Sequence, residues 1–92
     1  LLSVGKHAEA VKDYEEALKL DPENTGVLNN LAWVMATSPD DSVRNADRSI
    51  ELGLKACELT KYEAPHILST LASGYAEKGD WETAIKWSKK AV

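Results

Sequence analysis

The stretch from Leu68 to Ala91 constrains the fold more than any other part of the chain. Its apolar and small residues follow helical spacing up to Gly79 and then resume with two alanines seven residues apart. These residues are Leu68, Leu71, Ala72 and Tyr75 before the glycine, and Ala84 and Ala91 after it. Residues three, four and seven apart share one face of an α-helix, and a glycine often ends a helix. The stretch therefore predicts two short helices that pack closely on each other.

Two earlier parts of the chain have a related arrangement. Leu28, Leu31, Ala32 and Met35 repeat the first half, and Ser49 and Ala56 follow seven residues apart. Ala10 and Ala17 follow Gly5 with the spacing of the second half alone. Similarity between segments at a nearly fixed period indicates an array of stacked units. The sequence thus predicts helix pairs, of which the first pair lacks its first helix.

These residues resemble the tetratricopeptide repeat (TPR), whose pattern is a large residue, Leu, a small residue and Tyr, followed by Ala, an aromatic residue and a closing Pro. Ala10, Tyr14, Ala17 and Pro22 match the second half of that pattern. The resemblance implies an all-α fold, a right-handed helix-turn-helix repeat array (a TPR-like α-solenoid) of about two and a half repeats. It implies a single domain over residues 1–92, with a partial first repeat 1–24, a second repeat 25–64 and a third repeat 65–92.

The spacing also predicts where the helices lie. Five helices are expected near residues 6 to 20, 25 to 37, 45 to 60, 65 to 78 and 80 to 92, preceded by a short helical remnant that Gly5 ends. Ala17 and Ala56 are 39 residues apart, whereas Ala56 and Ala91 are 35 apart. The family period is about 34 residues. About five extra residues are therefore expected between Ser38 and Asn45, where Pro39 and the neighbouring aspartates are predicted to order the turn.

Composition excludes several classes of partner. The formal net charge is −4, so no concentrated basic face for nucleic acid or an anionic membrane is expected. The longest apolar run, Leu31 to Ala36, is far shorter than the roughly 20 residues that span a bilayer, and the amino terminus does not resemble a signal peptide. The chain is thus expected to be soluble. A single cysteine favours a reducing compartment such as the cytoplasm. The first residue is not Met, so the chain is expected to be part of a longer protein.

No residue pattern suggests catalysis. His7 and His66 lie in different repeats without spacing to acids or to Cys57 that suggests a metal set or an activated nucleophile, and no glycine-rich phosphate loop occurs. His7 is interpreted as a packing residue at a helix start. The Asp40-Asp41 pair either caps a helix or is solvated in the turn, or it binds a cation. Cys57 is either a small core residue or a reactive thiol. We expect no enzyme activity, catalytic residue, metal or cofactor.

The resemblance implies that the first helices of the repeats line a concave face that binds peptides. Helical geometry independently identifies the residues that lie away from the packing stripe of those helices. The predicted groove comprises Asn29, Asn30, Trp33, Thr37, His66, Ser69, Ser73 and Glu77, with Gly26, Ala36 and Ala76 on the same face. Trp33 is either an exposed anchor for a ligand or a residue packed between repeats. One branch of the family holds the C-terminal carboxylate of heat-shock chaperones, but His66 and Thr70 stand where its basic pair belongs, so that clamp is not expected.

Two functions from different classes follow. The first is a protein-protein interaction module that binds a peptide or protein segment in the concave groove. The alternative is a structural spacer or self-association segment of a larger protein, with a possible homo-oligomer formed through the open repeat ends. With either function, apolar surface is expected at the open ends, at Leu1, Leu2, Trp87 and Val92. The identity of the partner is not encoded in any motif.

Overall fold

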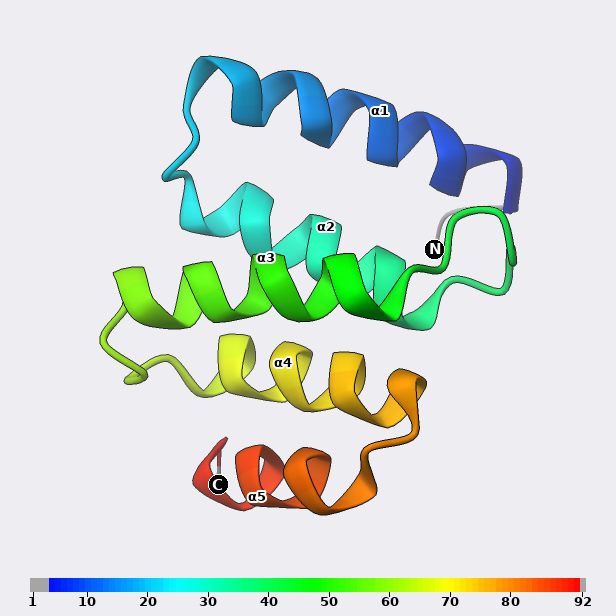
Figure 1. Ribbon diagram of the computed structural model, residues 1–92. Helices are drawn as coiled ribbons and strands as arrows, with labels where there is room; N and C mark the ends of the chain where they lie inside the picture. The colour runs from blue at the N-terminus through cyan, green and yellow to red at the C-terminus, as the bar shows by residue number, and fades with distance from the viewer. Residues whose placement is uncertain (1–3, 92) are drawn as a thin grey trace.

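The computed structural model describes residues 4–91, and over that range the chain forms five α-helices and no strand (Figure 1). The helices are α1 Val4–Leu20, α2 Thr25–Thr37, α3 Ala46–Leu59, α4 Pro65–Lys78 and α5 Trp81–Ala91. Each predicted helix is present, and the described ends lie within two residues of their expected positions. The predicted all-α helical repeat array is therefore confirmed.

The amino-terminal end differs from the prediction at Gly5. This residue was expected to end a helical remnant, but it lies inside α1, which begins at Val4. Glycine in a helix costs only about 1 kcal/mol relative to alanine, so one glycine near a helix start does not interrupt a continuous pattern. The expected remnant itself falls on residues 1–3, outside the described part of the chain.

Consecutive helices pack as neighbours and form a stack that runs from α1 to α5 (Figure 1). Helix α2 packs against α3, and α4 packs against α5. Helix α4 also packs on both α2 and α3, whereas the backbone of α1 packs on α2 alone among the described helices. The middle of the stack is thus the best-packed part, and α1 is held from one side.

The helix ends follow the residues that cap them. At the start of α2, the Asn24 side chain accepts a hydrogen bond from the Val27 N–H at 3.1 Å. At the start of α3, the Asn45 side chain accepts a hydrogen bond from the Arg48 N–H. Gly79 ends α4 with a φ of 92°, a left-handed conformation that glycine adopts without strain. Asp80 then begins α5 by accepting a hydrogen bond from the Thr83 N–H. These local signals explain why the expected boundaries agree with the structure.

The core consists of the predicted inward stripe of α2 together with residues from α3 and α4. Its fully buried members include Leu28, Leu31, Ala32, Leu52, Ala56, Cys57, Leu68 and Leu71. Where α2 crosses α3, the buried Ser49 hydroxyl donates a hydrogen bond to the Ala32 carbonyl oxygen at 2.7 Å. Small residues at the crossing therefore bring the two backbones close together.

Two glycines allow α4 to approach α3 as closely as α2 does. A Cβ at Gly74 would lie 3.0 Å from the Ser49 hydroxyl oxygen and 3.2 Å from Ile50 Cγ1. A Cβ at Gly53 would lie 3.2 Å from Leu71 Cδ1. The absence of side chains at these two positions therefore sets how α4 lies on α3.

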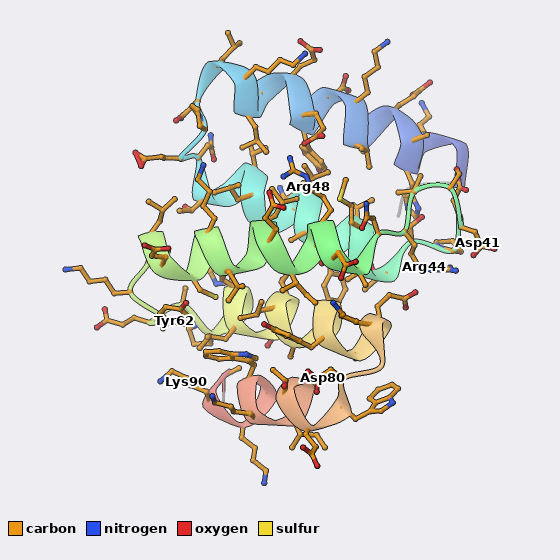
Figure 2. The ribbon with its side chains drawn as sticks, in the orientation of Figure 1. Asp41, Arg44, Arg48, Tyr62, Asp80 and Lys90 are labelled. Atoms are coloured by element: carbon orange, nitrogen blue, oxygen red, sulfur yellow. The ribbon has the colours of Figure 1, made fainter. Side chains whose placement is uncertain are left out.

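The turn between α2 and α3 is tied to the rest of the fold. The Asn45 N–H donates to the Met35 carbonyl oxygen at 2.8 Å, and the Val43 side chain is buried. Arg44 forms ion pairs with Asp41, beside which it lies in Figure 2, and with Glu77 of α4 at 2.9 Å. The expected ordering of the turn thus rests on long-range contacts as well as on its own turn chemistry.

Limited proteolysis should leave this turn intact. We expect a protease with broad specificity to cleave Val43→Gly within residues 38–45 at least about 10-fold faster than the native chain, because the valine anchors the turn to the core. Mapping the first fragments by mass spectrometry measures this. Cleavage of the native chain at the same sites and rate would mean that the turn opens freely.

No helix within residues 4–91 combines the length and the apolar character that are needed to cross a lipid bilayer.

Candidate functional site

Three of the predicted groove residues line one groove of about 600 Å³. Trp33 projects from α2 with 48% of its surface exposed, and Ser69 and Ser73 lie on α4. The remaining lining residues are Ala72 and Ala76 of α4, and Trp81, Ala84, Ile85, Ser88 and Lys89 of α5. The groove therefore begins at Trp33 and extends across α4 onto α5.

The other predicted residues do not line this groove. Asn30 and His66 are exposed, and Asn29 is half-buried with its Oδ1 atom without a hydrogen-bond partner among the described residues. The Thr37 hydroxyl donates to the Trp33 carbonyl oxygen at 2.7 Å, and Glu77 pairs with Arg44. These side chains lie on α2 and α4 beyond the groove.

Ala36 corrects the expected face of α2. It was predicted to lie away from the packing stripe, but only 4% of its surface is exposed. The prediction considered only the contact between α2 and α3, whereas α4 also packs on α2. Because α2 packs against α1, α3 and α4, its buried face is wider than a single stripe.

Helix α5 contributes five residues to the groove that the sequence did not predict there, and two of them are large and apolar. Trp81 and Ile85 are four residues apart and are 64% and 52% exposed. They lie on the same side of α5 as Ala84 and Ser88, which also line the groove. The four-residue spacing of these large apolar residues was the available signal.

Trp87 is a second correction on α5. It was expected to be an exposed end residue, but it is half-buried and stacks on Tyr62 with ring centroids 5.4 Å apart. Tyr62 lies in the turn between α3 and α4, next to α5 (Figure 2). The three other residues expected to expose apolar surface, Leu1, Leu2 and Val92, lie outside the described part of the chain.

The groove carries little charge. Lys89 is the one ionised side chain among its lining residues, and no carboxylate lines it. Within residues 4–91, Lys89 forms no ion pair. The groove is thus an apolar surface with hydroxyl groups and one cation at its edge.

The comparison with protein families agrees with this architecture. Residues 1–37, which include α1 and α2, match a family model described as TPR repeat. Over these residues the chain is similar to the TPR family. A search of curated proteins found no significant match. TPR repeats are in general protein-interaction modules, and the helical array continues through α3, α4 and α5.

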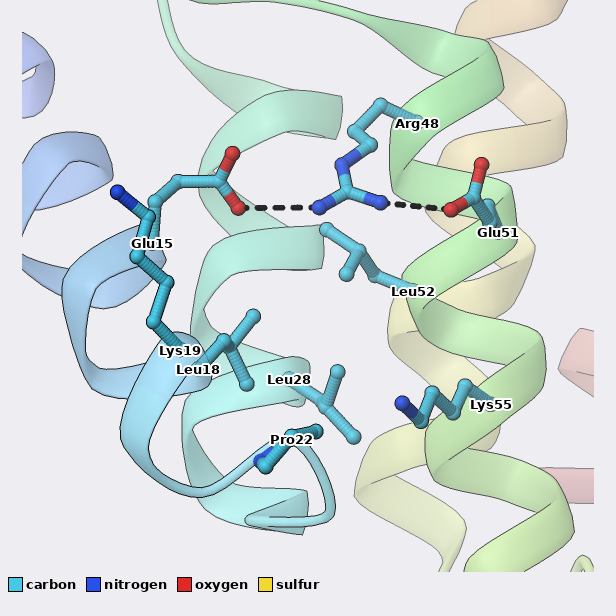
Figure 3. A pocket seen from close by; sticks show the side chains of 9 residues that line it. All are labelled: Glu15, Leu18, Lys19, Pro22, Leu28, Arg48, Glu51, Leu52 and Lys55. Carbon is cyan, nitrogen blue, oxygen red and sulfur yellow. Dashed lines mark hydrogen bonds and ion pairs between the residues drawn. The ribbon is translucent and has the colours of Figure 1, made fainter.

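A second, smaller pocket of about 380 Å³ lies between α1 and α3 (Figure 3). Arg48 bridges it by pairing with Glu15 of α1 at 3.1 Å and with Glu51 of its own helix at 2.6 Å. Because α1 does not pack on α3 directly, the Arg48 to Glu15 pair links the two helices. Arg48, Glu15 and Glu51 therefore have a structural role in this pocket.

The residues considered as candidates for chemistry, His7, Asp40 and Cys57, have structural surroundings. His7 Nδ1 lies 2.8 Å from the Ser38 hydroxyl oxygen, which joins α1 to the α2–α3 turn. The Ser42 hydroxyl and N–H donate to Asp40 and lower the pKa of its carboxyl. Cys57 is completely buried. Among residues 4–91, no group of three His, Cys, Asp or Glu side chains is arranged to hold a metal ion.

Proposed function

We propose that this chain is a protein-interaction module that binds a peptide or protein segment in the groove between Trp33 and α5. The observation that carries the proposal is the half-exposed indole of Trp33 at the edge of a solvent-open apolar groove. Tryptophan is enriched among the residues that dominate binding energy at interfaces, and contiguous exposed apolar surface often marks such a site.

The polar residues beside the indole suit a peptide ligand. The Ser73 hydroxyl donates to the Ser69 carbonyl oxygen within its own helix, which leaves its oxygen free to accept a bond from a ligand. The exposed Ser69 hydroxyl can donate or accept. In this proposal Trp33, Ser69 and Ser73 form the centre of the site, and a longer ligand reaches the flanking residues Asn29, Asn30, Thr37, His66 and Glu77.

The repeat boundaries are part of the same proposal. The division into a partial repeat 1–24, a repeat 25–64 and a repeat 65–92 within one domain is supported by the packing of α2 with α3 and of α4 with α5. On this division the groove lies where the second and third repeats meet, a position that stacked repeats commonly use for binding.

Peptide selection tests the proposed function. We expect random 12-residue peptides displayed on phage to yield sequences that bind the chain, and Trp33→Ala to weaken their binding about 30-fold, or by about 2 kcal/mol. The fold should be nearly unchanged because the indole is half-exposed.

The matched control is Leu20→Ala, which removes the most exposed large apolar side chain of the described residues, 90% exposed and outside the groove. This variant should bind as the native chain does. Failure to select any peptide, or equal binding by Trp33→Ala, would contradict the proposal.

Exposure of Trp81 and Ile85 favours a second candidate function, which is self-association through the α5 end of the array. We expect the chain to associate in a concentration-dependent way and Trp81→Glu to reduce that association by placing a charge in the contact. Sedimentation equilibrium measures the association constants of the native chain and of Trp81→Glu. A native chain that stays monomeric at high concentration would remove this candidate.

A further inference from the structure

The α4–α5 pair repeats the α2–α3 pair residue by residue. Ala72 and Ala76 of α4 follow Ala32 and Ala36 of α2 by 40 positions. Ala84, Ile85 and Ser88 of α5 follow Ser49, Ile50 and Gly53 of α3 by 35 positions. What covers the first pair therefore indicates what the second pair can accept.

A helix covers these positions on the first pair. Gly74 of α4 lies against Ser49 and Ile50, and Leu71 lies against Gly53, at the distances given above. Under this cover Ile50 is only 9% exposed.

The same positions on the second pair form the floor of the groove. Ala84, Ile85 and Ser88 all line it, together with Ala72 and Ala76. Ile85 is 52% exposed, against 9% for its counterpart Ile50. Small side chains flank the isoleucine on both helices, so the backbone of a third helix can approach here as that of α4 does on the first pair.

An ion pair fixes the direction in which α4 lies. Lys78 at the end of α4 pairs with Asp47 at the start of α3, with Nζ and Oδ1 2.6 Å apart. The counterpart of Asp47 on α5 is Glu82, an exposed acid in the first turn. At the other end of α5, Lys89 stands where α3 has Leu54. Neither Glu82 nor Lys89 forms an ion pair within residues 4–91.

We propose that the groove binds an amphipathic α-helix of a partner protein, antiparallel to α5, with an acidic residue near its N-terminus facing Lys89 and a basic residue near its C-terminus facing Glu82. This inference rests on the proposed function, because it assigns the class of ligand to the same groove. An apolar stripe on the partner helix contacts Trp33, Trp81 and Ile85.

A second copy of this chain fits the groove less well than a partner helix does. The apolar face of α4 is already buried, with Ile67, Leu68 and Leu71 each no more than 3% exposed. The large exposed apolar residues outside the groove, Leu20 and Leu59, each lie at the end of a helix. The described residues therefore offer no free helical face that matches both the apolar stripe and the charges.

The segment 63–78 of the chain supplies a probe with the required features. It contains the apolar stripe of α4, with Glu63 before the helix and Lys78 at its end. We expect a fluorescein-labelled peptide of this sequence to bind the protein. A matched peptide with Glu63→Lys and Lys78→Glu has the same composition and should bind about fivefold more weakly or worse, because both ion pairs become repulsive.

Variants of the protein locate the binding. The double variant Glu82→Lys with Lys89→Glu should invert the preference between the two peptides, and Ile85→Asp should weaken both by about 10-fold. The control is Glu9→Lys with Lys12→Glu, an equal exchange of exposed charges on α1 outside the groove, which should leave both affinities unchanged.

Each contrary result overturns a defined part of the inference. Equal binding of the two peptides removes the direction, and no binding of either peptide removes the helical ligand. If Ile85→Asp leaves binding unchanged, the peptide binds to α3 in place of α4 and not in the groove. If the native protein is a dimer that Ile85→Asp dissociates, the occupant is a second copy. Extended peptides that require Trp33 while both helical peptides fail would leave the proposed function standing and contradict the helical ligand alone.

Discussion

Gly74→Leu is expected to destabilise the fold by about 3 kcal/mol, the largest effect on stability among these predictions. A single Cβ at this position already lies 3.0 Å from the Ser49 hydroxyl oxygen and 3.2 Å from Ile50 Cγ1. Ser49 cannot easily move away, because it is fully buried and hydrogen-bonded to the Ala32 carbonyl oxygen. The added side chain therefore forces α4 away from α3.

Urea unfolding followed by circular dichroism measures this change. Gly26→Leu is the size-matched control, since Gly26 is an exposed glycine in α2 whose Cβ would meet only Asn24 Oδ1, at 3.4 Å. Leucine has the higher helix propensity, so this control should be neutral or stabilising by up to about 1 kcal/mol. Equal unfolding midpoints for Gly74→Leu and the native chain would show that the two helices do not approach as closely as the structure has them.

The helices were predictable because their signals are local. Asn24, Asn45 and Asp80 cap the starts of α2, α3 and α5, and Gly79 ends α4 in a conformation that other residues adopt only with strain. The apolar stripe of α2 is likewise a matter of spacing within one helix. Each of these features depends on residues a few positions apart, which a sequence displays directly.

The candidate site was predictable only in part, because it depends on how three helices meet. Trp33 was identified from its place off the packing stripe of α2, and it lines the groove as a half-exposed residue. The contribution of α5 was missed, since Trp81 and Ile85 line the groove only because α5 packs beside α4. Ala36 was misplaced for a related reason, because the buried face of α2 depends on helices from other parts of the sequence that pack against it.

Alkylation of Cys57 is expected to be at least about 100-fold slower in the folded chain than in the unfolded chain at pH 8. Burial raises the pKa of this thiol from 9.0 to about 11, and none of its surface is exposed. The thiolate is the reactive form, so a rise of about two pKa units lowers its population about 100-fold even before access is considered. Reaction with iodoacetamide, with and without urea and followed by mass spectrometry, measures the ratio.

An accessible thiol provides the control for this experiment. Leu20→Cys in a Cys57→Ala chain should react in the folded state at nearly the unfolded rate, because residue 20 is almost fully exposed. The same pKa rise predicts the direction of a pH effect. The unfolded thiol ionises first as pH rises, so the native chain loses stability between about pH 9 and 11, whereas below that window the thiol is protonated in both states and contributes no pH dependence. Two results would contradict a buried Cys57. One is reaction of Cys57 in the folded chain as fast as the exposed control thiol. The other is a loss of unfolding free energy from neutral pH to above pH 9 that is the same in the native chain and in Cys57→Ala.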